Sequence, residues 1–292
     1  MVSNSDRTPN PPTLQELSTL TKPQLSSLLS VRDLTVEFRT RSGVVTALEH
    51  ISFHINQGET IGIVGESGSG KSVLAMAIMG ILDRAGKVTN GEVLWSQEQD
   101  NSVYNLLQMP DKRLRQLRGK ELSMIFQNPR VALNPIRKVG QQLADVLRCH
   151  TTLSGAAIKT RAIELLASVN IPDPQQRYHA YPYELSGGQC QRIMIALALA
   201  CTPKLLIADE PTTGLDVTTQ ATVMNLLRDL TTERQMATIV ITHDLALASQ
   251  YCDRILVMYA GHLVESAPAH TLFAQPSHPY TMKLINSYPQ DP

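Results

Sequence analysis

A run of eight residues, 65–72, has the composition of a phosphate-binding loop, called the phosphate loop below. Its glycines let the backbone wrap closely around an anion, and successive N–H groups at the start of the following helix would point at phosphate oxygens. Lys71 would reach the β- and γ-phosphates of a nucleotide, and Ser72 would ligate Mg²⁺ through its hydroxyl. The nucleotide-binding residues expected here are Gly65, Glu66, Ser67, Gly68, Ser69, Gly70, Lys71 and Ser72.

Two adjacent carboxylates, Asp209 and Glu210, follow the apolar run 205–208. Open α/β sheets bind their ligands at the carboxyl ends of such strands. Asp209 is therefore expected to hold Mg²⁺ directly or through water, and Glu210 to polarise the attacking water as a general base. The alternative, an acidic cap on the next helix, loses weight because a phosphate loop precedes it in the same domain.

A third segment, Leu-Ser-Gly-Gly-Gln at 185–189, offers phosphate donors of a different kind and is called the signature segment. At a helix N-terminus, its hydroxyl and backbone N–H groups can bond a γ-phosphate from a second side. The expected nucleotide-binding residues of this segment are Ser186, Gly187, Gly188 and Gln189. A small-molecule kinase would account for the phosphate loop and the carboxylates but leaves this segment unexplained.

In order along the chain, these motifs resemble the ATP-binding cassette (ABC) ATPases. Gln127 matches the glutamine loop of that family, His243 its switch histidine, and Phe38 the aromatic residue that stacks on adenine. The resemblance implies ATP and Mg²⁺ as cofactors, with Glu210, His243 and Gln127 as catalytic residues. An imidazole can bond the γ-phosphate and help to position water, and a glutamine can sense the metal and that water. The implied metal ligands are Ser72, Gln127 and Asp209.

The elements that must position these residues follow an α/β pattern. Residues 30–38 and 44–55 alternate apolar and polar side chains, as half-buried antiparallel strands do. Strand, loop and helix then follow at 59–82, and no internal repeat is present. Further strands are expected at 205–208, 238–242 and 254–259, and helices at 141–148, 157–169, 218–233 and 245–251. The expected fold is an α/β P-loop NTPase with a RecA-like core, an N-terminal antiparallel β subdomain and an inserted α-helical subdomain.

The domain boundaries follow from changes in composition. Residues 1–28 are rich in Ser, Thr, Pro and Asn and are expected to form a disordered tail, with a short amphipathic helix at 14–29 as the alternative. Residues 29–285 would form the ATPase domain, with the helical subdomain at about 113–183. Residues 286–292 would form a C-terminal tail.

The overall charge and hydropathy restrict the partners. Lys plus Arg and Asp plus Glu both number 26, so no net charge draws the chain to nucleic acid. The sequence has no apolar run of the roughly 20 residues that span a bilayer, and a membrane role would therefore require a partner. The family resemblance implies that the signature segment of one cassette faces the phosphate loop of another. A second ABC ATPase subunit, identical or a sister, is therefore expected.

Further segments resemble one branch of the family, the bacterial peptide and nickel importer ATPases. They lie at 126–135, 181–188, 207–213, 258–261 and 278–281. The resemblance implies two transmembrane permease subunits that contact residues 127–142, a periplasmic or lipid-anchored solute-binding protein, and a peripheral location on the cytoplasmic face of the inner membrane. The short stretch after the His-Pro-Tyr-Thr motif is closer to nickel and metallophore members, so peptide and nickel substrates both stay open. The alternative is a non-transport ABC ATPase acting on nucleic acid or ribosomes. Such members carry tandem cassettes, long coiled coils or zinc insertions, and this sequence has none of them.

Overall fold

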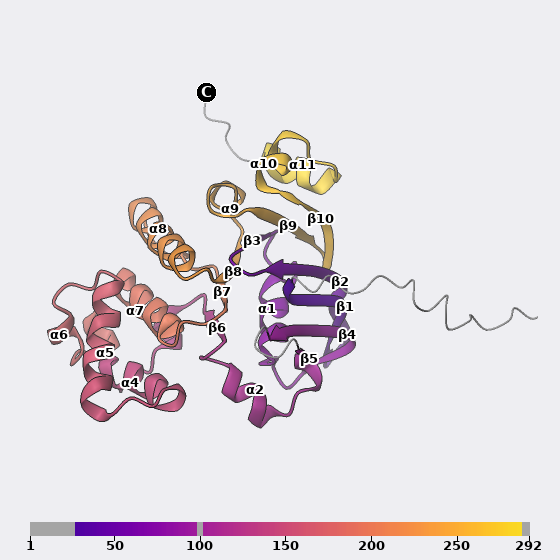
Figure 1. Cartoon of the computed structure of the whole chain (residues 1–292). Coiled ribbons are helices and arrows are strands. Elements are labelled where there is room, and N and C mark those ends of the chain that lie inside the picture. The colour runs from indigo at the N-terminus through magenta and orange to yellow at the C-terminus, as the bar shows by residue number, and fades with distance from the viewer. Residues whose placement is uncertain (1–26, 98–101, 288–292) are drawn as a thin grey trace, which may run out of the picture.

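The computed structural model describes residues 27–97 and 102–287, in which helices and strands alternate along most of the chain (Figure 1). The strands are β1 (Ser27–Thr40), β2 (Gly43–Asn56), β3 (Thr60–Val64), β4 (Gly86–Gln97), β5 (Ser102–Asn105), β6 (Leu122–Ile125), β7 (Leu205–Asp209), β8 (Ala237–Thr242), β9 (Arg254–Tyr259) and β10 (His262–Pro268). The α-helices are α1 (Lys71–Met79), α2 (Asp111–Leu117), α3 (Pro129–Ala132), α4 (Val139–His150), α5 (Gly155–Ser168), α6 (Pro174–Arg177), α7 (Gly187–Leu199), α8 (Val217–Glu233), α9 (Leu245–Tyr251), α10 (Ala269–Ala274) and α11 (Pro279–Asn286). Two 3₁₀ turns are η2 (Leu106–Gln108) and η3 (Pro182–Glu184).

A six-stranded sheet in the order β10-β9-β3-β8-β7-β6 forms the centre of the molecule. Its strands are parallel except β10, which runs antiparallel to β9. Strands β7 and β8 are buried along their whole length, which explains their continuous apolar sequences. The register pairs Val64 with Thr242 and Asp209 with Ile241. The segments that follow β3, β7 and β8 therefore emerge side by side at one edge of the sheet.

A second sheet, in the order β2-β1-β4-β5, is antiparallel and lies over α1 (Figure 1). The alternating sequence predicted its first two strands, and their buried side chains share one hydrophobic core with α1 and the inner face of the six-stranded sheet. The fully buried Trp95 belongs to this core. Helix α1 ends at Met79, earlier than expected, because Gly80 adopts a left-handed conformation (φ 64°) and bonds back to the carbonyls of Ala77 and Met76.

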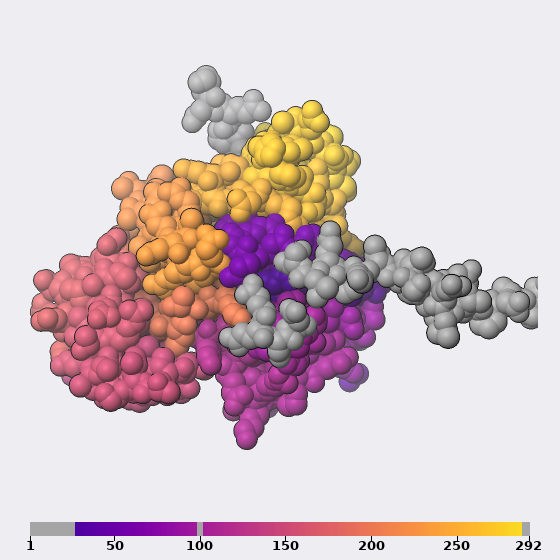
Figure 2. Space-filling view, in the orientation of Figure 1, coloured from indigo at the N-terminus to yellow at the C-terminus, as the bar shows by residue number. Residues whose placement is uncertain are grey.

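Helices α4 to α7 form a lobe beside the sheet, visible in rose at the left of Figures 1 and 2. Its core joins these helices to α8 and to side chains of β6 and β7. The helical region expected at 113–183 is wrong in its first part, since β6 lies inside that range and pairs in parallel with β7. A strand of four residues, three of them apolar, carries too little periodicity to be distinguished from a helix.

The two ends of the described chain differ from the expected boundaries by a few residues. Strand β1 begins at Ser27, so the predicted N-terminal tail overlaps it, and the rest of that prediction, residues 1–26, lies outside the described residues. Helix α11 ends at Asn286, and residues 288–292 of the predicted C-terminal tail also lie outside them. Within residues 27–97 and 102–287, every helix falls short of the length and apolar character that a bilayer-spanning segment requires.

Candidate active site

The phosphate loop folds around the side chain of its own lysine. Lys71 is the first residue of α1, and its Nζ donates to the carbonyl oxygens of Gly65 at 2.7 Å and Glu66 at 2.8 Å. Its side chain is buried, with only 5% of the residue exposed. The ammonium group is therefore already held at the centre of the loop by backbone carbonyls.

Two glycines of this loop are required by its close contacts. A Cβ on Gly65 would lie 2.1 Å from the carbonyl oxygen of Met258 on β9, a separation that no side chain tolerates. Gly70 precedes α1 with φ 100°, and a Cβ there would lie 2.7 Å from the carbonyl of Ala47. The loop is thus confined between β2 on one side and β9 on the other, and only glycine fits at these positions.

Ser72 and Asp209 place two oxygen ligands next to each other. Ser72 Oγ donates to Asp209 Oδ1 at 3.2 Å, and Asp209 is 4% exposed. Burial raises the pKa of Asp209, although the hydrogen bond from Ser72 opposes this shift. Neighbouring ligands of an octahedral Mg²⁺ at 2.0–2.1 Å lie about 2.9 Å apart, close to the separation seen here. A hydroxyl and a buried carboxylate at this spacing fit Mg²⁺, which would offset the cost of burying the charge.

Glu210 is held by hydrogen bonds on its backbone and its side chain. The residue has a left-handed φ of 45°, and its N–H donates to the carbonyl of Ile241 on β8 at 2.9 Å. Its Oε2 accepts from Gln127 Nε2 at 2.9 Å and from Thr213 Oγ1 at 2.7 Å, while Oε1 lies 3.4 Å from His243 Nδ1. A non-glycine residue keeps this φ only where its surroundings fix it.

These contacts set the charge of the groups at the site. Burial alone would raise the pKa of Glu210, but the hydrogen bonds from Thr213 and Gln127 and the charge of His243 outweigh it and lower the pKa. Burial lowers the pKa of Lys71, and the carboxylates of Glu210 and Asp209 oppose that shift. Glu210 is therefore ionised at neutral pH, as a general base must be.

The structure brings seven of the predicted residues into one cavity of about 210 Å³. It is lined by Ala47, Ser67, Gly68, Gly70, Lys71, Ser72, Val73, Gln127 and Glu210. Asp209 and His243 contact this set through Ser72 and Glu210. Phe38 does not line the cavity: its ring packs on β4, 2.8 Å from where a Cβ of Gly86 would be. Its contact with adenine stays a prediction.

The signature segment lines a different cavity, of about 530 Å³. Ser186 is exposed and caps α7: its Oγ accepts from Gln189 N at 3.3 Å, and Gln189 Oε1 accepts from Ser186 N at 3.1 Å. This reciprocal capping fixes the first turn of α7, which lines the cavity. The cavity is lined by Pro172, Ser186, Gly187, Gly188, Gln189, Arg192, Gly214, Leu215, Asp216 and Thr219, none of which lines the cavity at the phosphate loop.

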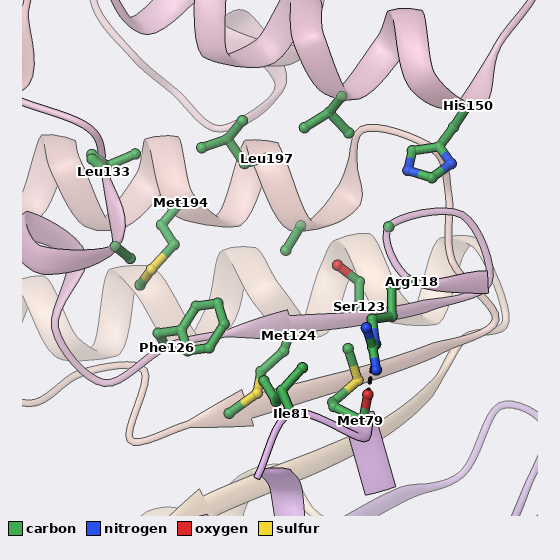
Figure 3. A pocket seen from close by; sticks show the side chains of 14 residues that line it. Met79, Ile81, Arg118, Ser123, Met124, Phe126, Leu133, His150, Met194 and Leu197 are labelled. Atoms are coloured by element: carbon green, nitrogen blue, oxygen red, sulfur yellow. Dashed lines mark hydrogen bonds between the residues drawn. The ribbon is translucent and has the colours of Figure 1, made fainter. Parts of the chain in front are cut away.

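A third cavity, the apolar groove, lies between β6 and the helical lobe and has a volume of about 310 Å³ (Figure 3). Phe126 and Met194 face it from opposite sides. Arg118 closes one end, where its Nε donates to the carbonyl of Met79 at 2.7 Å. The other side chains of this groove are Met79, Ile81, Ser123, Met124, Ala132, Leu133, Val146, His150, Leu197 and Ala198. Phe126 directly precedes Gln127, so the groove and the site are adjacent in the chain.

Sequence reasoning missed two contacts at the site. Thr213 bonds Glu210, and its place three residues after that carboxylate in Glu-Pro-Thr-Thr is a signal that could have been used. The phenol oxygen of Tyr280 accepts a hydrogen bond from the Glu66 amide at 3.0 Å. Tyr280 belongs to the His-Pro-Tyr-Thr motif, but no local pattern connects it with the phosphate loop.

A parallel sheet with a phosphate loop, an acidic strand end and a separate signature face defines a P-loop ATPase of the cassette type. Residues 48–213, more than half of the chain, match the ABC transporter family, and the chain belongs to that family and is one of its ATPases. Residues 264–291 match a second family, the oligopeptide/dipeptide transporter C-terminal region.

Individual proteins agree with this assignment. The dipeptide transport ATP-binding protein DppD of Haemophilus influenzae is 49% identical over 264 residues, which cover 90% of this chain and 78% of that protein. The oligopeptide transport ATP-binding protein OppD of Escherichia coli is 46% identical over 271 residues, covering 93% and 78%. The dimeric ATP-binding cassette MJ0796, solved in a post-hydrolysis state with ADP and Pi, has a TM-score of 0.72 at 28% identity and covers 82% of this chain and 98% of that chain. The predicted α/β fold of the P-loop ABC ATPases is confirmed.

Proposed function

We propose that this chain is the energy-coupling ATPase of a bacterial peptide importer. The observation that carries the proposal is the division of the site into two cavities, one with the lysine, the carboxylates and the glutamine, and one with the signature segment. Each cavity supplies only part of what an ATP needs. ATP hydrolysis therefore requires two cassettes whose opposite halves meet, a second subunit that is a sister or an identical copy.

In this mechanism the groups of the phosphate loop hold the nucleotide, and Glu210 acts on water. Lys71 would leave its carbonyl partners to bond the β- and γ-phosphates, and Ser72 and Asp209 would hold Mg²⁺, which would supply positive charge to the phosphates. Glu210 accepts the proton of the attacking water at Oε1, because Oε2 already accepts two hydrogen bonds. His243 and the signature segment of the other cassette stabilise the charge on the γ-phosphate.

The apolar groove is the proposed contact with the permease. Most of its side chains are apolar, it lies where the helical lobe meets the sheet, and it adjoins Gln127, which bonds Glu210. A displacement of Gln127 and Phe126 would therefore be transmitted to a permease helix bound in the groove. Two permease subunits, each on one cassette of the pair, would hold this chain at the cytoplasmic face of the inner membrane as a peripheral subunit.

The proposed substrate class is peptides, delivered to the permease by a periplasmic or lipid-anchored solute-binding protein. The relatives named for dipeptide and oligopeptide transport and the match at 264–291 support this choice over nickel or a metallophore. The residues that would contact the transported solute lie on other subunits, so the substrate class is decided by measuring uptake.

The test replaces the chromosomal gene by the Glu210→Gln variant and measures uptake of labelled dipeptides, oligopeptides, nickel and a nickel–metallophore complex. The matched control is Glu164→Gln, which removes an exposed carboxylate of α5 that pairs with Arg161. We expect peptide uptake to be lost in the first strain only. Loss of nickel uptake alone would assign the nickel branch. Unchanged uptake, with the protein recovered on ribosomes or nucleic acid, would contradict import and support the non-transport alternative.

A further inference from the structure

The C-terminal segment, residues 254–287, reaches the phosphate loop through a tyrosine. Tyr280, on α11, is 8% exposed, and its phenol oxygen accepts a hydrogen bond of 3.0 Å from the backbone N–H of Glu66. The ring lies on Tyr259 of β9, with ring centroids 4.3 Å apart. Burial raises the pKa of Tyr280, so the phenol stays neutral at physiological pH and the hydrogen bond is one between neutral groups.

The hydrogen bonds of the loop with Tyr280 and with Lys71 involve the same peptide unit. The carbonyl of Gly65 and the N–H of Glu66 belong to the same peptide group, which is planar with its oxygen and hydrogen on opposite sides. Lys71 Nζ occupies the carbonyl side at 2.7 Å, and the Tyr280 hydroxyl occupies the N–H side at 3.0 Å. Rotation of this unit would therefore break both hydrogen bonds together.

The same segment contacts the loop at two other points. Gly261, in the turn between β9 and β10, donates its N–H to the carbonyl of Ser69 at 3.2 Å. The carbonyl of Met258 lies where a side chain on Gly65 would be. The first part of the loop is thus fixed by Tyr280 and Met258 and the later part by Gly261.

Helix α11 is in turn fixed to β10. The carboxylate of Glu265 accepts from the backbone N–H of Ser277 at 2.8 Å and of His278 at 2.9 Å, and His278 Nδ1 accepts from Tyr280 N at 3.2 Å. These bonds satisfy donors at the start of α11, which would otherwise be unpaired. The position of the Tyr280 hydroxyl is therefore determined by the strand and not by the side chain alone.

We propose that Tyr280 is a positioning residue for nucleotide binding. Its hydroxyl holds the Gly65–Glu66 peptide unit in the orientation from which Lys71 and the loop amides receive phosphate. Because the loop must otherwise be ordered by the nucleotide itself, this contact raises nucleotide affinity and leaves the chemical step unchanged. The inference rests on the proposed phosphate-binding role of residues 65–72.

The test is the Tyr280→Phe variant of the full chain, which removes one oxygen and keeps the ring. The matched control is Tyr251→Phe, which removes a hydroxyl that donates to Asn225 Oδ1 on α8 at 3.2 Å. Tyr251 is 9% exposed, close to the 8% of Tyr280. Binding of Mg-ATP to the purified chain is measured, together with KM and kcat of the complex assembled with its permease. We expect Tyr280→Phe to weaken binding and raise KM about 3- to 10-fold, the effect of one hydrogen bond, with kcat unchanged. Tyr251→Phe should bind as the unaltered chain does.

Two further measurements make the result specific. Hydrogen exchange of the Glu66 amide should be faster in Tyr280→Phe while the amides of α11 keep their protection, which a general loss of packing would not produce. Lys71→Ala should lose nucleotide binding. If it does and Tyr280→Phe binds normally, or if Tyr251→Phe is weakened equally, the role of Tyr280 is wrong and the proposed function stands. If Lys71→Ala binds normally, the phosphate-binding role of the loop is wrong, and the inference falls with it.

Discussion

The two surfaces of this chain that are proposed to face phosphate differ in how many contacts each makes with the rest of the chain. The phosphate loop is enclosed: Lys71 is buried, β2 and β9 confine the backbone, and Tyr280 covers one peptide unit. The signature segment caps its helix and then opens onto a cavity more than twice as large, with Ser186 exposed. The enclosed surface is thus ordered by contacts within the chain, whereas the open surface matches the proposal that it receives a nucleotide held by a second cassette.

Their electrostatics differ in the same way. At the loop, Lys71 faces Asp209 and Glu210: burial lowers the pKa of Lys71 and raises that of Asp209, whereas hydrogen bonds outweigh burial and lower the pKa of Glu210. At the signature cavity, Asp216 is solvent-exposed and its pKa is lowered by its hydrogen bonds with Thr219. The charges at the loop interact strongly before any nucleotide arrives, whereas those at the signature cavity are screened by water. The following predictions test this division, beginning with the largest effect.

The first concerns the enclosed surface. Glu210→Gln keeps the size of the side chain and removes the base, so hydrolysis by the assembled complex should fall about 10²- to 10⁴-fold while Mg-ATP binding is kept. Phosphate release and nucleotide binding are the two measurements. Hydrolysis at the unaltered rate would show that Glu210 is not the base.

The second concerns the open surface and uses Gly187→Asp. Gly187 is the first residue of α7, a Cβ there has open space, and an acidic residue at a helix N-terminus is stabilising. The isolated chain should therefore keep its Tm and its ATP affinity. In the assembled pair the new carboxylate would repel the γ-phosphate, and hydrolysis should fall about 10²-fold or more, as when one preorganised donor is lost.

A matched control exists on another helix of the same lobe. Gly155 is also the first residue of its helix, α5, follows a serine, and has open space around its Cβ. Gly155→Asp should leave both stability and hydrolysis unchanged. If Gly187→Asp hydrolysed ATP normally in the complex, the signature segment would not face a phosphate, and the comparison of the two surfaces would be wrong.

The third prediction concerns the pKa of Glu210, the proposed general base. Thr213→Val removes a hydrogen bond that lowers the pKa of Glu210, so the pKa should rise and the acid limb of kcat should move to higher pH, with little change above neutrality. The pH profile of kcat is measured beside that of Thr222→Val, which loses a hydroxyl on α8 bonded to the carbonyl of Thr218. Identical pH profiles of kcat for the two variants would show that Thr213 does not lower the pKa of Glu210.

The smallest effect concerns the attachment of α11. Glu265→Gln loses a charged acceptor for two backbone amides, and the chain should be less stable by about 1 kcal/mol, or a few degrees in Tm. Burial alone would raise the pKa of Glu265, but hydrogen bonds from Thr281, Ser277 and His278 lower it. A carboxylate whose pKa is lowered on folding stabilises the fold at pH values above its unfolded-state pKa. This stabilisation is lost as the pH falls through its folded-state pKa. The Tm difference between the two proteins should therefore be constant at neutral pH and shrink below about pH 4.3. A Tm difference that does not change with pH would show that the ionised form of Glu265 does not stabilise the fold.

The sequence was most informative where structure and chemistry depend on neighbouring residues. Glycines beside a lysine and a serine, and two carboxylates after an apolar run, are local patterns, and the structure places residues 65–72, Asp209 and Glu210 at one sheet edge. Strand β6 was missed because its four residues are too few to show a period. Thr213 was missed because its contact depends on the left-handed backbone of Glu210. For Phe38 the motif indicates a role, but the described ring packs on β4.

Chain order has a consequence for the newly made protein. Glu66 and Tyr280 are 214 residues apart, and ribosomes add about 5–20 residues per second, so the tyrosine is made about 10–40 s after the glutamate. Throughout that interval a nascent chain carries the phosphate loop without the hydroxyl that orients its first peptide unit, and without the glycine turn between β9 and β10. The contact between Tyr280 and the phosphate loop therefore forms only after nearly the whole chain has been made.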